Sequence, residues 1–532
     1  MLLRAGASAA KAAASHQRLP TTTTTATMAP TPTARLAAAA AQTQTARPTV
    51  ATAASPGPSA AATRSASPEA AAQDKWGGGD APSSSSSSRI LPRGVAVQSH
   101  LDGGNVEVLG AALAPDGATV DVALSIVPDP FCETDGRAHF MWFNFRVAGC
   151  RGVPLRMRLV NAGEGSFPGG WRGYQAMASY DAERWFRVDG TSYDDGSGEL
   201  RIEITPESDY VALAYFAPYT LDQLDRMLAR TAAQPGVALR VVGETLDGHD
   251  LPVLTFGGGG DDAPEKGRGG TPSELKQAEK KKEKKQIWLV CRQHPGETQA
   301  SWFAQGLADA LTDRHNPKAR ALLRSADVHL APNACPDGTS RGHLRTNAAG
   351  SNLNREWRHA RGELPDADRA PEAHFLTRAM DASPPDLLID VHGDEALPHV
   401  FIAGAEGVPG FYADAEGTDA GTPLGRAQGA LVDALLRHVA CFQTKKGYAK
   451  DAANGADMRI LSNAASARYG SLAVTLEMPF KRLRLPAGAL VPGGTAAVSA
   501  ADEDAFEEFG PEMCARVGRD MVGALLQMVP HL

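Results

Sequence analysis

The stretch IWLVCRQHPGETQASWFAQGLADAL, residues 287–311, contains the pattern on which the predicted fold depends. It opens with the apolar run Ile287–Val290, which is typical of a short buried strand. A Pro-Gly turn follows, and beyond it apolar residues recur four positions apart, which gives a helix one buried stripe. The stretch therefore predicts a strand, a tight turn and a helix, with His294 and Glu297 in the turn.

Strand patterns alternate with helix patterns from about residue 221 to the end of the chain. This alternation predicts a parallel sheet covered by helices. The predicted fold class is α/β, with a mixed, mostly parallel sheet flanked by helices in residues 221–532. Residues 257–285 interrupt the pattern with GGGG and KQAEKKKEKK, and we interpret them as a solvated low-complexity loop insertion.

Residues 89–220 follow a different rhythm, in which short runs alternate between apolar and polar side chains. Such alternation gives a strand one buried and one solvent-facing side. Several such strands separated by turn residues predict an antiparallel β-sandwich, for which a packing or substrate-shaping role is the simplest interpretation. The predicted strands are Val106–Leu109, Val120–Leu124, Leu155–Val160, Leu200–Ile204 and Tyr210–Phe216.

The first 88 residues differ from the rest in composition. Ala, Ser, Thr and Pro dominate, and no acidic residue precedes Glu69. Such a segment buries too little apolar surface to fold, so we predict a disordered tail. Its sparse arginines and its lack of acidic residues are also typical of an organelle transit peptide, while biased composition alone is the other interpretation.

The composition of the whole chain excludes several classes of protein. The 532 residues suggest two or three domains, and 43% hydrophobic and 21% charged residues are typical of globular proteins. A net charge of −8 argues against a nucleic-acid partner, and no apolar run is long enough to predict a membrane span. Six scattered cysteines indicate reduced, intracellular thiols. The expected location is the cytoplasm, or a plastid or mitochondrion if the tail is a transit peptide.

The predicted site lies where strands end, because ligands of open α/β sheets gather at the carboxyl ends of the strands. HPGE places His294 and Glu297 there, and LLIDVHGDE (387–395) is a second buried strand that ends in His392. Two imidazoles and one carboxylate form the ligand set of a catalytic zinc with one open position. Asp390 could orient an imidazole from behind or simply cap the strand. HxxE alone is also explained by a surface histidine and a glutamate that starts a helix.

Hydrolysis at zinc also needs a general base, and SLAVTLEMPFK (471–481) offers Glu477. This carboxylate lies on an otherwise apolar strand, where burial is costly unless the group faces a cleft. The turn-rich loop at 333–357 adds Arg345, Asn354 and Arg355. Arginine binds carboxylates through two parallel hydrogen bonds, so this loop is either a surface for anion recognition or an ordinary solvated loop.

These segments together resemble the M14 metallocarboxypeptidases, and the cytosolic-carboxypeptidase-like branch in particular. The matching motifs are HPGE, NACPDGTSRGHLRTNAAGSNLNREW, DVHGDEALPH and TLEMPFK, in the order of the family. GYQAMASYDAERWFRV and LAYFAPYT resemble the sandwich domain of that branch. The resemblance covers about residues 95–530 and implies a carboxypeptidase-type fold with one zinc ion per chain. It also implies that the substrate is the C-terminus of a peptide or protein.

The resemblance also implies the role of each site residue. His294, Glu297 and His392 would hold zinc, Glu477 would be the base and proton shuttle, and Arg345 would polarise the scissile carbonyl. Asn354 and Arg355 would bind the terminal carboxylate of the substrate. The family tyrosine would be Tyr469 or Tyr448, and Arg459 or Arg468 would provide a preference for acidic residues such as glutamate. The segment NGADMRILSNAASARYGS departs from the glutamate-trimming members, which leaves the choice of substrate open.

Three alternatives were weighed against the carboxypeptidase. GTSRG (338–342) matches the serine-hydrolase motif around Ser340, but the sequence after it does not predict the helix that such an elbow requires. A zinc amidohydrolase that removes acyl groups from small N-acyl amino acids would share HxxE, a distant histidine and a glutamate base. A non-catalytic binding protein could have kept the same pocket.

Overall fold

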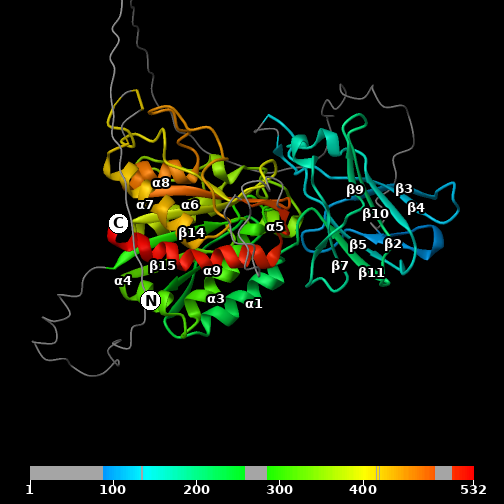
Figure 1. Ribbon diagram of the computed structural model, residues 1–532, viewed down its shortest axis with the longest axis horizontal. Coiled ribbons are helices and arrows are strands. Elements are labelled where there is room, and N and C mark those ends of the chain that lie inside the picture. The colour runs from blue at the N-terminus through cyan, green and yellow to red at the C-terminus, as the bar shows by residue number, and fades with distance from the viewer. Residues whose placement is uncertain (1–87, 133–135, 258–283, 415, 418–419, 486–505) are drawn as a thin grey trace, which may run out of the picture. The chain divides into compact units, whose positions relative to one another are not determined.

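The structure is a computed structural model that describes residues 88–132, 136–257, 284–414, 416–417, 420–485 and 506–532. The described residues belong to one compact unit, which spans residues 82–532 (Figure 1). The predicted tail (1–88) and the predicted insertion (257–285) lie almost entirely outside the described residues. Both therefore remain predictions from the sequence, as do the exact domain boundaries.

Two β-sheets at the start of the described chain share one apolar core. The six-stranded sheet has the order β1-β2-β5-β11-β7-β8, and its strands are β1 (Ser88–Ile90), β2 (Ala96–Gln98), β5 (Asn144–Ala148), β11 (Tyr210–Ala214), β7 (Met177–Ser179) and β8 (Phe186–Arg187). The five-stranded sheet has the order β3-β4-β6-β10-β9, and its strands are β3 (Glu107–Leu113), β4 (Val120–Ser125), β6 (Leu155–Leu159), β10 (Glu199–Ile204) and β9 (Thr191–Asp194).

The predicted sandwich is confirmed in its architecture. Every second residue of β4 and of β6 is buried, as the period-two pattern requires. The strands pair in antiparallel fashion, with one departure that the sequence did not reveal: β4 and β6 run parallel.

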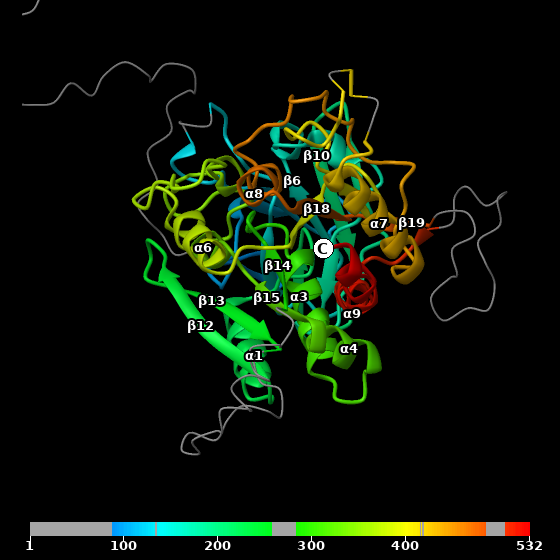
Figure 2. The ribbon, with the colours of Figure 1, turned by 90° about the vertical axis from the view of Figure 1, so that its left-hand side faces the viewer.

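A seven-stranded sheet follows, in the order β12-β13-β15-β14-β16-β18-β17. The four strands β15, β14, β16 and β18 run parallel, whereas β13 and β17 are antiparallel to their neighbours. Figure 2 shows β12 and β13 as a long hairpin at one edge of the sheet. The strands are β12 (Val237–Glu244), β13 (Asp250–Phe256), β14 (Lys285–Cys291), β15 (Ala326–Ala331), β16 (Leu387–Asp394), β17 (Phe401–Ala403) and β18 (Leu472–Pro479).

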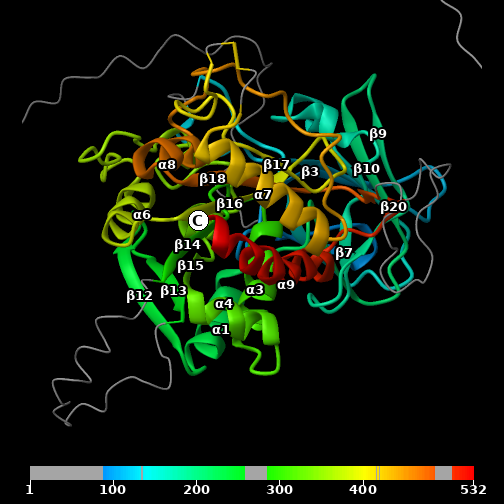
Figure 3. The same ribbon diagram turned by 60° about the vertical axis from the view of Figure 1, so that its left-hand side comes forward.

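Helices cover both faces of this sheet, which confirms the predicted α/β class. The large apolar core joins one face to α3, α7 and α9, and a smaller core joins the other face to α6 and α8 (Figure 3). The helices are α1 (Leu221–Ala232), α3 (Gln299–Thr312), α4 (Pro317–Ser325), α5 (Pro336–Arg341), α6 (Pro371–Ala382), α7 (Pro423–His438), α8 (Leu461–Tyr469) and α9 (Pro511–Met528). A two-stranded sheet pairs β19 (Leu483–Arg484) with β20 (Phe506–Glu507), and short 3-10 helices cover Pro92–Gly94, Ala162–Glu164, Pro168–Trp171, Leu353–Arg355 and Val529–His531.

The long helices α3 and α9 pack closely because glycines meet backbone at their contact. A Cβ atom added to Gly306 of α3 would lie 1.9 Å from the carbonyl oxygen of Ala515, and one added to Gly518 of α9 would lie 2.1 Å from that of Phe303. Only glycine tolerates such an approach between two helix backbones. This contact fixes α3, whose first turn follows the predicted site.

All six cysteines are buried. Among the described residues, none of the helices combines the length and the apolar character that crossing a membrane requires.

Candidate active site

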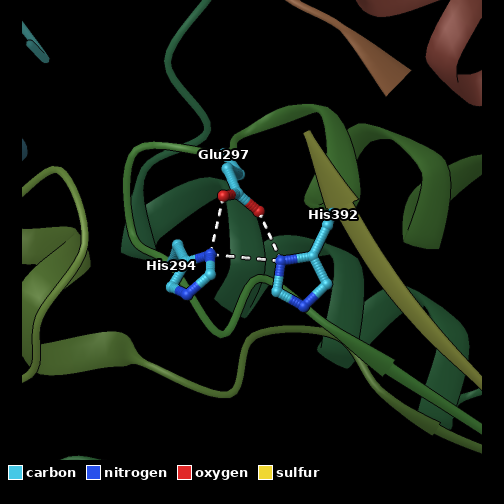
Figure 4. A group of neighbouring side chains, drawn as sticks. All are labelled: His294, Glu297 and His392. Carbon is cyan, nitrogen blue, oxygen red and sulfur yellow. Dashed lines mark hydrogen bonds and ion pairs between the residues drawn. The ribbon is translucent and has the colours of Figure 1, made fainter. Parts of the chain in front are cut away.

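Side chains from two segments that are almost a hundred residues apart meet where β14 and β16 end (Figure 4). His294 and Glu297 lie in the turn between β14 and α3, and His392 lies near the end of β16. One ligand atom from each of the three side chains lies within 4.8 Å of the others, and all three residues are buried. The Glu297 carboxylate lies 2.7 Å from Nδ1 of His294 and 2.7 Å from Nδ1 of His392.

Arg292 fixes the turn that carries His294 and Glu297. Arg292 has a positive φ of 59°, which reverses the chain directly after β14. Its buried guanidinium donates hydrogen bonds to the carbonyl oxygens of Pro295 and Tyr219, at 2.8 and 2.6 Å. These bonds fix the loop from inside, so the two ligand candidates are placed by a rigid turn.

The outer nitrogen of each imidazole has an oxygen partner. Nε2 of His294 lies 3.1 Å from Oδ1 of Asn352, and Nε2 of His392 lies 2.9 Å from Oδ2 of Asp390. An oxygen acceptor favours the tautomer with its proton on Nε2, and this tautomer leaves the lone pair of Nδ1 pointing inward. Of the two sequence interpretations of Asp390, the structure supports the orientation of an imidazole.

The residues at this point fit a zinc ion. The two Nδ1 atoms lie only 3.1 Å apart, and two inward lone pairs at that distance repel each other unless a proton or a cation lies between them. Burial, with a smaller contribution from the Arg345 guanidinium, lowers the pKa of His294 to about 3, so this imidazole is neutral, as metal binding requires. Two imidazole nitrogens and one carboxylate form a donor set that zinc prefers.

Glu477 lies beside these three residues because of the strand register. In the parallel pair β16–β18 it stands directly opposite His392. Adjacent strands are about 4.8 Å apart, so a side chain in this position reaches the same centre. Burial raises the pKa of the Glu477 carboxyl, which makes its ionised form a stronger base. Its Oε2 atom is buried and has no hydrogen-bond partner among the described residues.

A cavity of about 770 Å³ opens over this centre. Arg345 lines it, and the Nε atom of Arg345 is buried without a hydrogen-bond partner in the described part of the chain. A buried donor of this kind is costly unless a ligand accepts from it. The position and the open donor of Arg345 therefore suit an oxygen that binds in the cavity.

Asn354 and Arg355 also line the cavity. The Asn354 side chain is fixed, because its Oδ1 accepts a hydrogen bond from the backbone N–H of Leu461 at 2.9 Å. Its Nδ2 lies 3.4 Å from Nε2 of His392, and the Arg355 guanidinium lies 3.7 Å from the Asp457 carboxylate. The structure thus brings both predicted carboxylate-binding residues to the same cavity as the three ligand candidates.

Three other residues predicted to contact substrate do not line the cavity. Arg468 donates two hydrogen bonds to the carboxylate of Asp381, at 2.8 and 2.6 Å, and Tyr469 donates one at 3.0 Å. Both residues thus join α8 to α6. Arg459 pairs with Asp457 at 2.9 Å and is exposed.

The geometry of α8 explains this placement. Ser462 and Asn463, at the start of the helix, line the cavity. Arg468 lies six residues further on, or about 9 Å along the helix axis, and packs against α6. The spacing along α8 thus separates Arg468 and Tyr469 from the cavity that the start of the helix lines.

Tyr448 is the candidate tyrosine that the structure places in the cavity. Its hydroxyl lies 2.8 Å from Oδ2 of Asp394 and 3.1 Å from Oε1 of Glu477. Tyr448 is about 50% exposed, but desolvation of its hydroxyl and the nearby Glu477 carboxylate raise the pKa of Tyr448, so its proton stays in place. A single hydroxyl proton cannot form two full hydrogen bonds, so the carboxylates of Asp394 and Glu477 compete for the proton of Tyr448.

Sequence reasoning missed the residues that hold Asp390. Gln293 donates from Nε2 to both oxygens of Asp390, at 2.7 Å each, and Nε1 of Trp357 donates to Oε1 of Gln293 at 2.7 Å. All three residues are buried. The position of Gln293, next to His294, was the only available signal, because Trp357 meets it from a distant loop.

The serine-hydrolase alternative finds no support in the geometry. Ser340 lies within the short helix α5, and its hydroxyl donates to the carbonyl oxygen of Asp337 at 3.0 Å. It does not line the cavity.

A sequence model described as zinc carboxypeptidase matches residues 224–490 of the chain. The chain belongs to the zinc carboxypeptidase family. A second model, described as the cytosolic carboxypeptidase N-terminal domain, matches residues 97–216 of this carboxypeptidase, which is the sandwich. The resemblance predicted from four motifs is confirmed. The protein is a metallocarboxypeptidase, a hydrolase of a family that acts on the C-termini of peptides or proteins.

Individual relatives match different shares of the chain. An uncharacterized protein of Zymomonas mobilis is 34% identical to the carboxypeptidase, over 82% of this chain and 97% of its own length. Human cytosolic carboxypeptidase 1 is 26% identical over 51% of this chain, and the match spans only 24% of the human protein. These matches do not favour the amidohydrolase alternative.

Two solved structures resemble this carboxypeptidase over its described core. The metallo-carboxypeptidase of Burkholderia cenocepacia has a TM-score of 0.67 at 33% identity, covering 82% of this chain and 100% of the other. The metallo-carboxypeptidase of Pseudomonas aeruginosa, solved with (2-guanidinoethylmercapto)succinic acid, has a TM-score of 0.65 at 32% identity, covering 82% and 99%.

Proposed function

We propose that the carboxypeptidase removes the C-terminal residue of a peptide or protein at one zinc ion held by His294, Glu297 and His392. The convergence of their ligand atoms within 4.8 Å, at the wall of a cavity of about 770 Å³, carries this proposal. Zinc bound there would act as a Lewis acid on the scissile carbonyl and would make water a better nucleophile at neutral pH.

The remaining chemistry falls to side chains around this centre. Glu477 takes the proton of the attacking water and delivers it to the nitrogen of the departing amino acid. Arg345 donates hydrogen bonds to the carbonyl oxygen, on which negative charge develops as the bond to water forms. The buried, unpartnered Nε of Arg345 supports this role.

Asn354 and Arg355 bind the terminal carboxylate of the substrate in this proposal, which makes the enzyme an exopeptidase. Arg355 supplies a charge-assisted donor, and the fixed amide of Asn354 supplies a second donor at a set position. The relative from Pseudomonas aeruginosa was solved with a derivative of succinic acid, a molecule with two carboxylates. A ligand with carboxylates on this relative supports carboxylate recognition by the present enzyme.

We further propose that the enzyme favours acidic C-terminal residues such as glutamate. Lys445, Lys446 and Lys450 line the cavity, where Lys450 pairs with Glu406 at 3.1 Å. We assign to these lysines, which form a cationic rim of the cavity, the role predicted for Arg459 and Arg468, because those two arginines do not line the cavity. A carboxylate side chain gains from a cationic rim, although each exposed charge contributes little by itself.

Peptides that differ only in the last residue test the reaction and the preference together. We expect release of the last residue, fastest for glutamate, to stop with a chelator and to return with zinc. Replacing Lys445 and Lys446 by alanine should reduce the preference for glutamate over leucine by about fivefold, whereas Lys318→Ala on α4 should not. Equal rates for all last residues, or a preference for basic ones, would exclude the acidic preference. Hydrolysis of N-acyl amino acids alone would exclude the peptidase.

Metal analysis of purified protein tests the ligand set. We expect His294→Ala to lower the bound zinc to a small fraction of one ion per chain, because one of three protein ligands is lost. His315→Ala, which removes an exposed imidazole outside the cavity, is the matched control. Full zinc content in His294→Ala would contradict the assignment.

A further inference from the structure

The carboxylate of Asp129, a residue of the sandwich, accepts hydrogen bonds from the loop that carries Arg345. Asp129 lies in the sandwich part of the chain, after β4, and only 5% of its surface is exposed. Its Oδ1 accepts a hydrogen bond from the backbone N–H of Leu344 at 2.7 Å. Its Oδ2 accepts from the backbone N–H groups of Arg345 and Thr346, at 2.8 and 3.0 Å, and from the Thr346 hydroxyl at 3.1 Å.

These four hydrogen bonds define the path of the Arg345 backbone. Three consecutive N–H groups point at one carboxylate, so the loop curls around Asp129 as around a bound anion. Bonds to an ionised acceptor are stronger than neutral ones, and here they are buried. The contact joins residues more than two hundred positions apart in the sequence.

The same loop is held from its other side by the turn with the ligand candidates. The backbone N–H of Gly296 donates to the carbonyl oxygen of Leu344 at 2.9 Å. A Cβ atom at position 296 would lie 2.9 Å from that oxygen, so the two backbones are in direct contact. Leu344 is thus bound to Asp129 on one side and to the neighbour of Glu297 on the other.

A second residue of the sandwich faces the Arg345 side chain itself. The guanidinium carbon of Arg345 lies 5.9 Å from the centre of the Phe167 ring, and Phe167 lines the catalytic cavity. This distance is within the range of a cation–π contact. The sandwich therefore contacts Arg345 both at its backbone and at its guanidinium.

We propose that Asp129 is a positioning residue for hydrolysis, and that through it the sandwich completes the active site. Asp129 touches neither substrate nor metal; it sets where the Arg345 guanidinium stands when charge develops on the carbonyl oxygen. A donor fixed in advance stabilises that charge without reorganising, and a displacement of one ångström is enough to lose much of the effect. The inference rests on the proposed role of Arg345.

Asp129→Asn tests the proposal against a matched control in the same sandwich. The amide keeps one acceptor oxygen but turns an NH₂ group toward backbone donors. We expect kcat to fall by about tenfold to a hundredfold while KM changes by less than about twofold. Asp116→Asn is the control, because Asp116 also accepts two backbone N–H bonds and one threonine hydroxyl bond, but within an exposed turn of the sandwich. Its kinetics should match those of the unmodified enzyme.

A double-mutant cycle separates positioning from general damage. If Asp129 acts through Arg345, then Asp129→Asn should change kcat by less than about twofold in an Arg345→Ala background. A purely structural defect would lower kcat by the same factor in both backgrounds, and that result would overturn the inference. If Arg345→Ala alone leaves kcat unchanged, the proposed role of Arg345 fails instead.

Zinc content and thermal unfolding are measured on each variant. If Asp129→Asn does not fold, Thr346→Val replaces it, because this nearly isosteric change removes the hydroxyl bond to Asp129 and otherwise only a weak contact with the Cys132 thiol at 3.9 Å. We then expect a fall in kcat of about threefold or more, with unchanged KM and zinc content. Unchanged kcat in a folded Asp129→Asn or Thr346→Val variant would overturn the inference.

Discussion

The Nδ1 lone pair of each imidazole points inward because an oxygen atom accepts the proton on the outer Nε2 atom. Nε2 of His392 faces the Asp390 carboxylate, which Gln293 holds through two hydrogen bonds. Removing the charge of Asp390 weakens the preference for the tautomer that points its lone pair inward, and lowers the basicity of the imidazole. In the proposed zinc site, the buried network behind the centre would therefore support metal binding without touching the metal.

We expect Asp390→Asn to weaken zinc binding by about tenfold to a hundredfold, because the outer partner of the ligand loses its charge. Competition between the enzyme and a chelator of known affinity measures the change. Asp386→Asn is the control, since Asp386 accepts hydrogen bonds just before β16, at the far end of the strand from His392. Equal zinc affinity in the Asp390 variant and the unmodified enzyme would exclude this role.

Glu477→Gln should keep zinc and lose hydrolysis. The amide fills the same volume but cannot take up a proton, and general bases contribute about a hundredfold to ten-thousandfold to kcat. The measurement pairs kcat with metal analysis. Loss of the metal, or activity near that of the unmodified enzyme, would contradict the assignment. Glu372→Gln, which also replaces a buried glutamate but lies outside the cavity, should keep its activity.

Candidate site residues that lie at strand ends were easier to find from the sequence than those that lie in a helix or a loop. His294, Glu297 and His392 each lie at or beyond the end of an apolar run, so the strands predicted that they lie at one edge of the sheet, but not that β14 and β16 are neighbours. Tyr448 could not be distinguished from Tyr469, because its position depends on a loop fixed by distant contacts.

On the scale of single elements, the first turn of α6 carries a buried glutamate, Glu372, whose surroundings destabilise its ionised form. Glu372 is fully buried, one of its oxygens has no hydrogen-bond partner among the described residues, and the other accepts from Asn347 at 3.0 Å. Burial raises the pKa of Glu372 to about 7 from an ordinary value of 4.5. The folded protein therefore binds a proton that the unfolded chain releases between these two values.

This pKa shift predicts a fall in stability as pH rises. Between pH 4.5 and about 7 the folded state holds more protons at Glu372 than the unfolded state, so the free energy of unfolding decreases with pH. The difference of about 2.5 pH units corresponds to about 3 kcal/mol. Glu372→Gln should remove this dependence and stabilise the protein above pH 7, as measured by denaturant unfolding at several pH values. The same pH slope in both proteins would contradict the prediction.

Strands and helices themselves were predicted closely, whereas their pairing was not. The predicted strand at 287–290 and the predicted helix at 298–311 correspond to β14 and α3. The register that sets Glu477 opposite His392 joins residues 85 positions apart in the sequence. Local periodicity contains no information on such pairing, although the apolar strand around Glu477 already indicated that this carboxylate faces a cleft.

On the scale of the whole molecule, the described residues form a sandwich and a catalytic part that share the active site. The sequence predicted both parts but gave the sandwich no chemical role, because none of its residues forms a catalytic pattern. The proposed role of Asp129 and Phe167 depends on their contacts with Arg345. A positioning residue of this kind leaves no local signal, since its partner lies in another part of the chain.

Truncation tests which part of the chain the enzyme needs. The residues that line the cavity lie between Phe167 and Glu477, and the first of the two family matches begins at residue 97. Removing residues 1–87 leaves β1 and its pairing with β2 intact. We therefore expect kcat and KM of the shortened enzyme to stay within about twofold of the original values, measured on the same peptide.

A longer deletion provides the contrast to this truncation. Removing residues 1–105 also removes β2, which pairs with β5 in the sandwich, and Asn105, whose side chain donates to the carbonyl oxygen of Gly342 at 2.9 Å. Gly342 lies just before the Arg345 loop, so this deletion should lower both thermal stability and kcat. If the shorter deletion already abolishes activity, the first 87 residues take part in folding or catalysis, and their interpretation as a dispensable tail is wrong.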